Sequence, residues 1–102
     1  MIHPYSVYGN NAVVHYQRKM GRDSIDIAVD RDILERLCKE VRNICVRWDG
    51  PRRPVWRVAV TDYNDKSFYL ARWITMAPEK MVVDHIDHDT LNNRKDNLRI
   101  VS

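Results

Sequence analysis

The most informative part of the sequence runs from residue 82 to residue 101 and reads VVDHIDHDTLNNRKDNLRIV. An apolar run ends in the adjacent carboxylate and imidazole of Asp84 and His85, a polar loop follows, and a second apolar run returns from Leu98 to Val101. Hydrolysis of a phosphodiester needs a base for the water and a cation for the charge on the leaving oxygen. A histidine suits the first task near neutral pH, and a carboxylate suits a hard cation such as Mg²⁺. By itself, an Asp-His pair at a strand end is more often a turn cap with a surface histidine.

The whole stretch resembles the HNH (His-Me finger) homing endonucleases of phages and mobile introns. The resemblance rests on residues 83–87 (VDHID), 92–94 (NNR) and 97–101 (NLRIV), and it extends more loosely upstream through residues 69–80. It implies that Asp84 is a ligand for Mg²⁺ or Mn²⁺ and that His85 is the general base. It also implies that Asn93 holds the loop that orients His85 and that Asn97 stands at the third motif position.

Three departures from the family pattern bear on the site. Family members often carry His where this chain has Ala71, and Gly where it has His88. In the family, a helix follows the second strand and brings a second metal-binding side chain, commonly Asn or His. This sequence ends at Ser102. The resemblance therefore implies an incomplete ββα-metal element whose metal site is open and weak.

The residues upstream predict a small antiparallel β-sheet with one main helix. Runs rich in Val and Tyr at 5–8 and 12–17 flank Gly9-Asn10-Asn11, which favours a hairpin, and the alternation in residues 25–29 predicts a third strand. Asp30 then caps a helix that ends near Arg42-Asn43. Its apolar face is formed by side chains spaced three or four residues apart, namely Ile33, Leu34, Leu37, Cys38 and Val41.

Further short elements complete the prediction. Strands are expected at 44–48, 55–60 and 67–70, and a short helix at 71–76. The fold class is therefore α+β, a small antiparallel sheet with one main helix followed by the incomplete HNH hairpin. At 102 residues, the chain is expected to form a single domain with a β-rich part (1–76) and the hairpin (77–102).

The charges are distributed unevenly, although the net charge is only +3. Between residues 42 and 57 lie five arginines and one acid, interleaved with two tryptophans, whereas residues 84–97 carry four aspartates against two cations. Such a pattern is typical of a surface that grips phosphate beside a metal site, and equally of a solvated basic strand pair beside an acidic turn. The candidate nucleic-acid-binding residues are Arg47, Arg52, Arg53, Arg57, Arg94 and Lys95. Trp48, Trp56 and Trp73 are predicted in or beside the core in preference to stacking on bases.

Other features restrict the setting. No apolar run approaches the roughly 20 residues that cross a bilayer, and the N-terminus lacks the order of a secretory signal. The prediction is a cytoplasmic protein without a membrane partner, in the bacterial host if the chain comes from a phage. Cys38 and Cys45 fit neither a zinc site nor a disulfide framework and are predicted to be buried reduced thiols.

Three functions remain open at this stage. The first is a metal-dependent endonuclease that nicks or cleaves double-stranded DNA, or a fragment of such an enzyme, with Asp84 and His85 as its working pair. The second is a catalytically degenerate HNH-like phage protein that binds a host protein, such as an inhibitor of a host DNA-targeting system of the anti-CRISPR kind. The third is a DNA-binding module without cleavage, which rests on the arginines of residues 42–57. The oligomeric state is open in each case.

Overall fold

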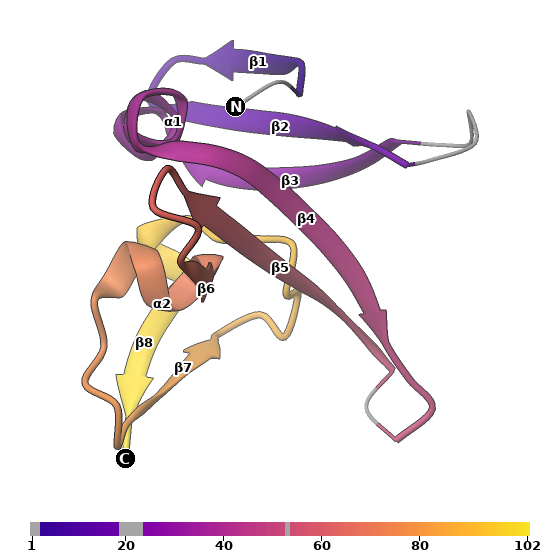
Figure 1. Cartoon of the computed structure of the whole chain (residues 1–102). Coiled ribbons are helices and arrows are strands. Elements are labelled where there is room, and N and C mark those ends of the chain that lie inside the picture. The colour runs from indigo at the N-terminus through magenta and orange to yellow at the C-terminus, as the bar shows by residue number, and fades with distance from the viewer. Residues whose placement is uncertain (1–2, 19–23, 53) are drawn as a thin grey trace.

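Three antiparallel sheets and two α-helices make up the chain in a computed structural model that describes residues 3–18, 24–52 and 54–102 (Figure 1). The first sheet has the order β1-β2-β3, the second β4-β5-β6, and the third pairs β7 with β8. An α+β class is therefore confirmed, with two three-stranded sheets in place of the one sheet predicted. The elements are β1 (Tyr5–Tyr8), β2 (Asn11–Gln17), β3 (Ser24–Asp30), α1 (Arg31–Glu40), β4 (Val41–Asp49), β5 (Val55–Asp62), β6 (Ser67–Tyr69), α2 (Leu70–Thr75), β7 (Val82–His85), the short 3₁₀ helix η1 (Lys95–Asn97) and β8 (Leu98–Val101).

The first sheet confirms the predicted hairpin and third strand. Gly9 takes a φ of 60° in the turn between β1 and β2, a conformation that glycine adopts without steric cost. On the face turned away from the core, a chain of hydrogen bonds crosses all three strands. Ser6 Oγ lies 2.8 Å from His15 Nε2, and His15 Nδ1 lies 2.8 Å from Asp26 Oδ1. These polar contacts tie the three strands together on that face.

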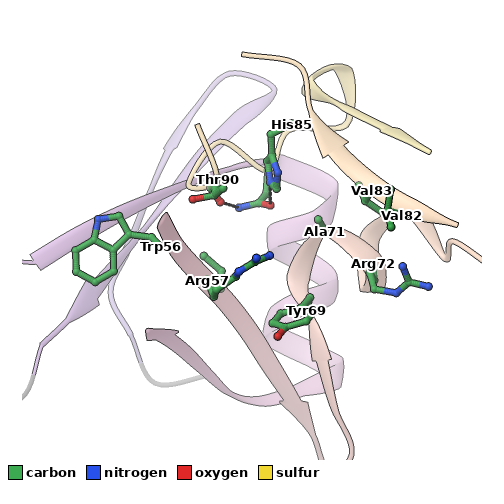
Figure 2. Close-up of a pocket in the computed structure, with 11 residues that line it drawn as sticks. Trp56, Arg57, Tyr69, Ala71, Arg72, Val82, Val83, His85 and Thr90 are labelled. Atoms are coloured by element: carbon green, nitrogen blue, oxygen red, sulfur yellow. Dashed lines mark hydrogen bonds between the residues drawn. The ribbon is translucent and has the colours of Figure 1, made fainter. Parts of the chain in front are cut away.

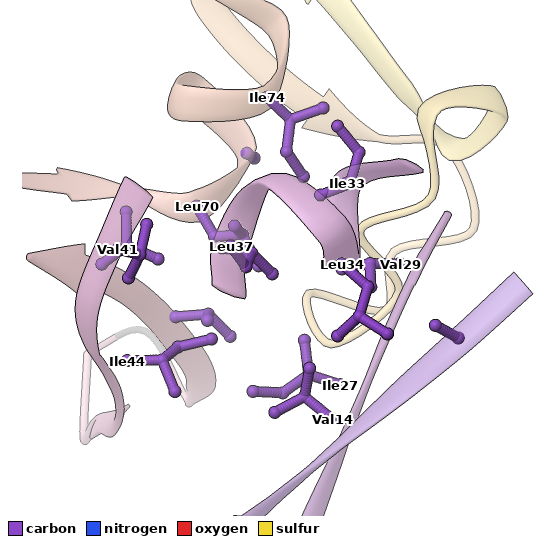
Figure 3. Close-up of a cluster of buried hydrophobic side chains, with 14 of the residues drawn as sticks. Val14, Ile27, Val29, Ile33, Leu34, Leu37, Val41, Ile44, Leu70 and Ile74 are labelled. Atoms are coloured by element: carbon purple, nitrogen blue, oxygen red, sulfur yellow. The ribbon is translucent and has the colours of Figure 1, made fainter. Parts of the chain in front are cut away.

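Helix α1 packs one face against the hydrophobic core (Figure 3). Ile33, Leu34 and Leu37 are buried as predicted. The helix ends at Glu40, two residues earlier than expected, because Val41 already pairs with Asp62 as the first residue of β4. The core draws on both three-stranded sheets, both helices and β8.

The cysteine prediction is wrong for Cys38, which is exposed, and Cys45 is only half-buried. Cys38 follows Leu34 by one helical turn but lies beside Tyr5 and Val7 of the edge strand β1, beyond the region that the core covers. Burial therefore ends one turn earlier on this side of α1 than the periodicity predicts.

The β4–β5 hairpin extends away from the rest of the molecule (Figure 1). Val46 and Val58 are the last fully buried pair along it, and Trp48 and Trp56 pair across the strands beyond them. Their rings meet edge to face with centroids 5.0 Å apart. Trp56 and Trp73 pack against the core as predicted, but Trp48 is 55% exposed. The prediction for Trp48 is wrong because the hairpin continues past the core.

No helix in the described ranges is long and apolar enough to cross a membrane.

Candidate functional site

The β7–β8 pair presents Asp84 and His85 on opposite faces. Asp84 pairs with Arg99 and His85 with Leu98, and successive residues of a strand point to opposite sides. Arg99 donates from Nε and Nη2 to Asp84 Oδ2, at 2.8 and 2.7 Å. His85 turns toward the body of the protein. The two residues that the sequence placed in one site thus have different surroundings.

The imidazole of His85 is held by Asn93, whose side chain is buried to 1% exposure. Asn93 Nδ2 donates to the carbonyl of Thr90 at 3.1 Å, and a carbonyl can only accept, so the orientation of the amide group is fixed. Its Oδ1 then faces His85 Nε2 at 3.0 Å, and this nitrogen must carry the proton. The neutral tautomer that results leaves the lone pair on Nδ1, for which the described residues supply no hydrogen-bond partner.

Asp87 and Asn97 organise the loop between the two strands. Asn97 is buried, accepts from the Asp87 amide at 3.0 Å and donates to Asp87 Oδ1 and to the carbonyl of Asn92, both at 2.9 Å. Asn92 Nδ2 donates to Asp87 Oδ2 at 2.9 Å, and the amide of Asp89 donates to Asp87 Oδ1 at 2.8 Å. These hydrogen bonds, that from Asn92 foremost, lower the pKa of the Asp87 carboxyl. The hydrogen bonds of the Asn97 side chain thus go to Asp87 and to the Asn92 carbonyl.

The loop is anchored to the N-terminal sheet by its backbone. The amide of Asn93 donates to the carbonyl of Ala28 at 2.8 Å, and the amide of Ala28 donates to the carbonyl of Leu91 at 2.9 Å. The segment therefore adds a short parallel bridge to the free edge of β3. Asn93 is consequently positioned by residues more than sixty positions earlier in the chain.

A second anchor joins the loop to the start of α1. The backbone amide of Lys95 donates to Asp30 Oδ2 at 2.7 Å, and Lys95 Nζ donates to Asp32 Oδ2 at 2.6 Å. The hydrogen bond from Lys95 lowers the pKa of Asp32, and the same bond raises the pKa of Lys95. Asp30 makes no side-chain cap to α1, so its carboxylate serves the loop.

His85 and Asn93 line a pocket of about 250 Å³ between the hairpin and the second sheet. Figure 2 shows the Arg57 side chain extending from β5 between Tyr69 and His85. Arg72 also lines this pocket, but its guanidinium donates to the backbone carbonyls of residues 77, 78 and 81 and so secures the approach to β7. Ala71 adds only a methyl group to the wall. The pocket thus combines an oriented imidazole with a guanidinium, which suits an anionic ligand.

In this arrangement, the residues around Asp84 do not form a site for a divalent metal ion. One oxygen of Asp84 is bound to Arg99, and within the described ranges no three His, Cys, Asp or Glu side chains come together to hold an ion. Mg²⁺ requires near-octahedral oxygen coordination, usually through one or two carboxylates and several waters. A divalent ion at Asp84 Oδ2 would compete with the Arg99 guanidinium for that oxygen.

The candidate nucleic-acid-binding residues fall into separate groups. Arg47 and Arg57 pair directly across β4 and β5, and Arg52 lies in the loop at the hairpin end. Arg94 directly precedes η1 and has Asp96 at 3.8 Å, and Lys95, the first residue of η1, is bound to Asp32. Arg53 lies outside the described residues. The structure therefore brings Arg47 and Arg57 together, whereas Arg94 and Lys95 contact the acidic side chains of Asp96 and Asp32.

Sequence reasoning missed three residues of this site. Arg99 could have been found from the sequence, because it lies directly opposite Asp84 when β7 and β8 are aligned as a hairpin. Asp87 could also have been found, because closely spaced Asp and Asn residues are typical of turns that are stabilised by side-chain hydrogen bonds. Tyr69 reaches the pocket only through the packing of β6 beside β5 and gives no local signal.

Comparison with known proteins agrees with the C-terminal part of this description. Residues 76–102 match the family model of the HNH endonucleases. The match covers β7, the organised loop with His85 and Asn93, and β8. This part of the chain is thus similar to HNH nucleases, a class that acts on DNA. No curated protein and no solved structure matches the chain.

Proposed function

We propose that this chain is an HNH-type endonuclease that hydrolyses phosphodiester bonds in DNA, with His85 as the general base. The observation that carries the proposal is the fixed imidazole. Asn93 Oδ1 accepts a hydrogen bond from the Nε2–H group of His85, with 3.0 Å between the two atoms. The lone pair on His85 Nδ1 can then accept a proton from a water molecule. The buried amide and its backbone anchors on Ala28 hold that orientation before any substrate arrives.

The reaction follows from these groups. His85 Nδ1 takes a proton from water as the water oxygen bonds to phosphorus, and the bond from phosphorus to the 3′ oxygen breaks. The 3′ oxygen takes a proton from solvent, and the products are a 3′ hydroxyl and a 5′ phosphate. Arg57, in the same pocket, stabilises the negative charge on the non-bridging oxygens. Asn93 is a positioning residue, since it acts through His85.

Binding of DNA is assigned in this proposal to the arginines of the second sheet. Arg47 and Arg57 lie on one face of that sheet, and Arg52 lies at the hairpin loop, with Arg53 next to it in the sequence. Arg94 and Lys95 flank the far end of the His85 loop. In this proposal Asp84 is the ligand for Mg²⁺ or Mn²⁺, and the ion replaces Arg99 at the Asp84 carboxylate.

Nicking of supercoiled plasmid by the full chain tests the proposal, with Mg²⁺ or Mn²⁺ and a chelator control. We expect His85→Ala to lower the rate by a factor on the order of 10² to 10⁴, the usual loss when a general base is removed. His88→Ala is the matched control, because it removes an exposed histidine of the same loop. Nicking that persists in His85→Ala would mean that His85 is not the base.

A second candidate is a catalytically inactive HNH-like protein that binds a host protein, such as an inhibitor of a host DNA-targeting system. The specific observation in its favour is the Asp84–Arg99 pair, which occupies the carboxylate that the resemblance assigns to metal. Absence of nicking by the wild-type chain with every metal tested would favour this candidate over the nuclease.

A further inference from the structure

The outer face of the β4–β5–β6 sheet is hollowed into a trough of about 510 Å³. Its floor is made of side chains that point away from the core, with Arg47 on β4, Arg57 on β5 and Tyr69 on β6. Arg57 and Tyr69 line this outer trough and also the His85 pocket. The two hollows therefore lie on either side of the same two side chains.

The charge of the outer trough favours an anion. Arg47 and Arg57 stand directly opposite each other, an arrangement in which like charges destabilise a sheet. Asp49 offsets part of this repulsion through its contact with Arg57 Nε at 3.3 Å. Among the described residues Arg47 has no acidic or hydrogen-bonding partner. A phosphate between the two guanidinium groups would bind Arg47 and remove the repulsion.

The same surface offers a ring on which a base can stack. Tyr69 is 53% exposed, and the guanidinium carbon of Arg57 lies 5.7 Å from its ring centroid. Alternating cationic and aromatic side chains are what single-stranded nucleic acids require, since phosphates bind the cations and bases stack on the rings. An acidic peptide would bind the two arginines but would have no base to stack on the Tyr69 ring.

The width of the face also favours one strand. Neighbouring strands of a sheet lie about 4.8 Å apart, so the face spans roughly 10 Å between β4 and β6. That is room for one sugar–phosphate backbone with its bases. We propose that the outer trough binds single-stranded DNA and leads its backbone into the His85 pocket. The substrate of the proposed nuclease is then a strand that is unpaired beside the bond to be cut, and this step rests on the proposed function.

Binding can be measured apart from cleavage. The full chain is titrated in EDTA against fluorescein-labelled dT15 and against a 15-base-pair dA·dT duplex, with anisotropy as the readout. We expect tighter binding of dT15, and Tyr69→Leu should weaken it about 5- to 100-fold, the range for loss of one stacked base. Tyr69→Phe keeps the ring and should stay within about twofold of the wild type. Arg47→Ala should reduce the salt slope for dT15 by about 0.7, the value for one phosphate on a single strand.

Matched controls separate this surface from general effects. Tyr8→Leu and Arg31→Ala alter an exposed tyrosine and an exposed arginine on other elements and should leave dT15 affinity unchanged. Equal affinity for duplex and single strand, unchanged binding in both Tyr69→Leu and Arg47→Ala, or displacement of dT15 by an equal charge of polyglutamate would each overturn the proposal. If the variants lose dT15 binding but the wild type never nicks, the outer trough stands and the nuclease fails. If the wild type nicks through His85 and the variants bind dT15 normally, the nuclease stands and the outer trough fails.

Discussion

Asp84 and Arg99 face each other across β7 and β8, and two nitrogens of Arg99 lie 2.8 and 2.7 Å from the same oxygen, Asp84 Oδ2. A guanidinium in this place uses the lone pairs that a cation would bind and adds positive charge where a cation would arrive. Arginine stays protonated throughout the pH range in which proteins fold, so pH does not relieve the competition. The ion pair therefore competes with a metal ion for this oxygen of Asp84.

Removing Arg99 should make Asp84 available to a metal. The pair is partly exposed, so we expect Arg99→Gln to tighten Mn²⁺ binding roughly fivefold, the factor for about 1 kcal/mol. Free Mn²⁺ measured by electron paramagnetic resonance gives the affinity. Asp84→Asn added to Arg99→Gln should abolish the gain, and Arg94→Gln should not reproduce it. Equal Mn²⁺ affinity in the wild type and Arg99→Gln would show that Arg99 does not compete.

The parts of the fold that the sequence predicted depend on local chemistry. The β1–β2 hairpin follows from a turn that tolerates positive φ, and the buried face of α1 follows from a spacing of three or four residues. The prediction failed where burial depends on distant segments. Trp48 is exposed because the β4–β5 hairpin extends beyond the core. Cys38 is exposed because β1 does not cover that side of α1.

The same division holds for the candidate site. His85 and Asn93 were predicted together because they belong to one continuous stretch with a strong family resemblance. The anchors on Ala28 and Asp32 were not predicted, because strand-edge pairing and the Lys95 contact join segments more than sixty residues apart. Tyr69 entered the site in the same way, through the register of β5 and β6.

The acid stability of the loop should depend on Asp87. Hydrogen bonds from Asn92, the Asp89 amide and Asn97 lower its pKa in the folded protein below the ordinary value of 3.8. A carboxyl with a depressed folded pKa contributes stability that is present above its unfolded pKa and is lost as the pH falls through the folded value. We therefore expect the melting temperature of the wild type to fall more steeply below about pH 4 than that of Asp87→Asn. Melting curves between pH 2.5 and 6 measure this, with Glu79→Gln as the exposed control. Parallel curves for the wild type and Asp87→Asn would remove Asp87 from this role.

Leu37 tests whether the described elements unfold together. Its side chain is fully buried between the two sheets, so Leu37→Ala should lower the free energy of unfolding by about 2 to 5 kcal/mol. Denaturant curves followed by far-ultraviolet circular dichroism and by tryptophan fluorescence should shift together, since Trp56 and Trp73 pack on the same core. Lys39→Ala, on the exposed side of the helix, should change the value by less than about 0.5 kcal/mol. A shift in only one signal would mean two units that unfold separately.

His88 occupies a backbone conformation that glycine adopts more easily, and this gives the last prediction. Its φ is 64°, and its amide donates to the carbonyl of His85 at 2.9 Å in the turn that directly follows the proposed base. For a residue with a Cβ this conformation costs roughly 1 to 2 kcal/mol, whereas glycine adopts it freely but loses more chain entropy on folding. His88→Gly should therefore raise the free energy of unfolding by roughly 0.5 to 1 kcal/mol, measured by urea denaturation. His88→Ala keeps the Cβ and should give no gain, which separates backbone strain from the loss of the imidazole. Since neither change touches the His85–Asn93 hydrogen bond, any nicking by the wild type should persist in both variants. A gain in His88→Ala equal to that in His88→Gly would assign the effect to the side chain, and a loss in both variants would show that the imidazole itself stabilises the loop.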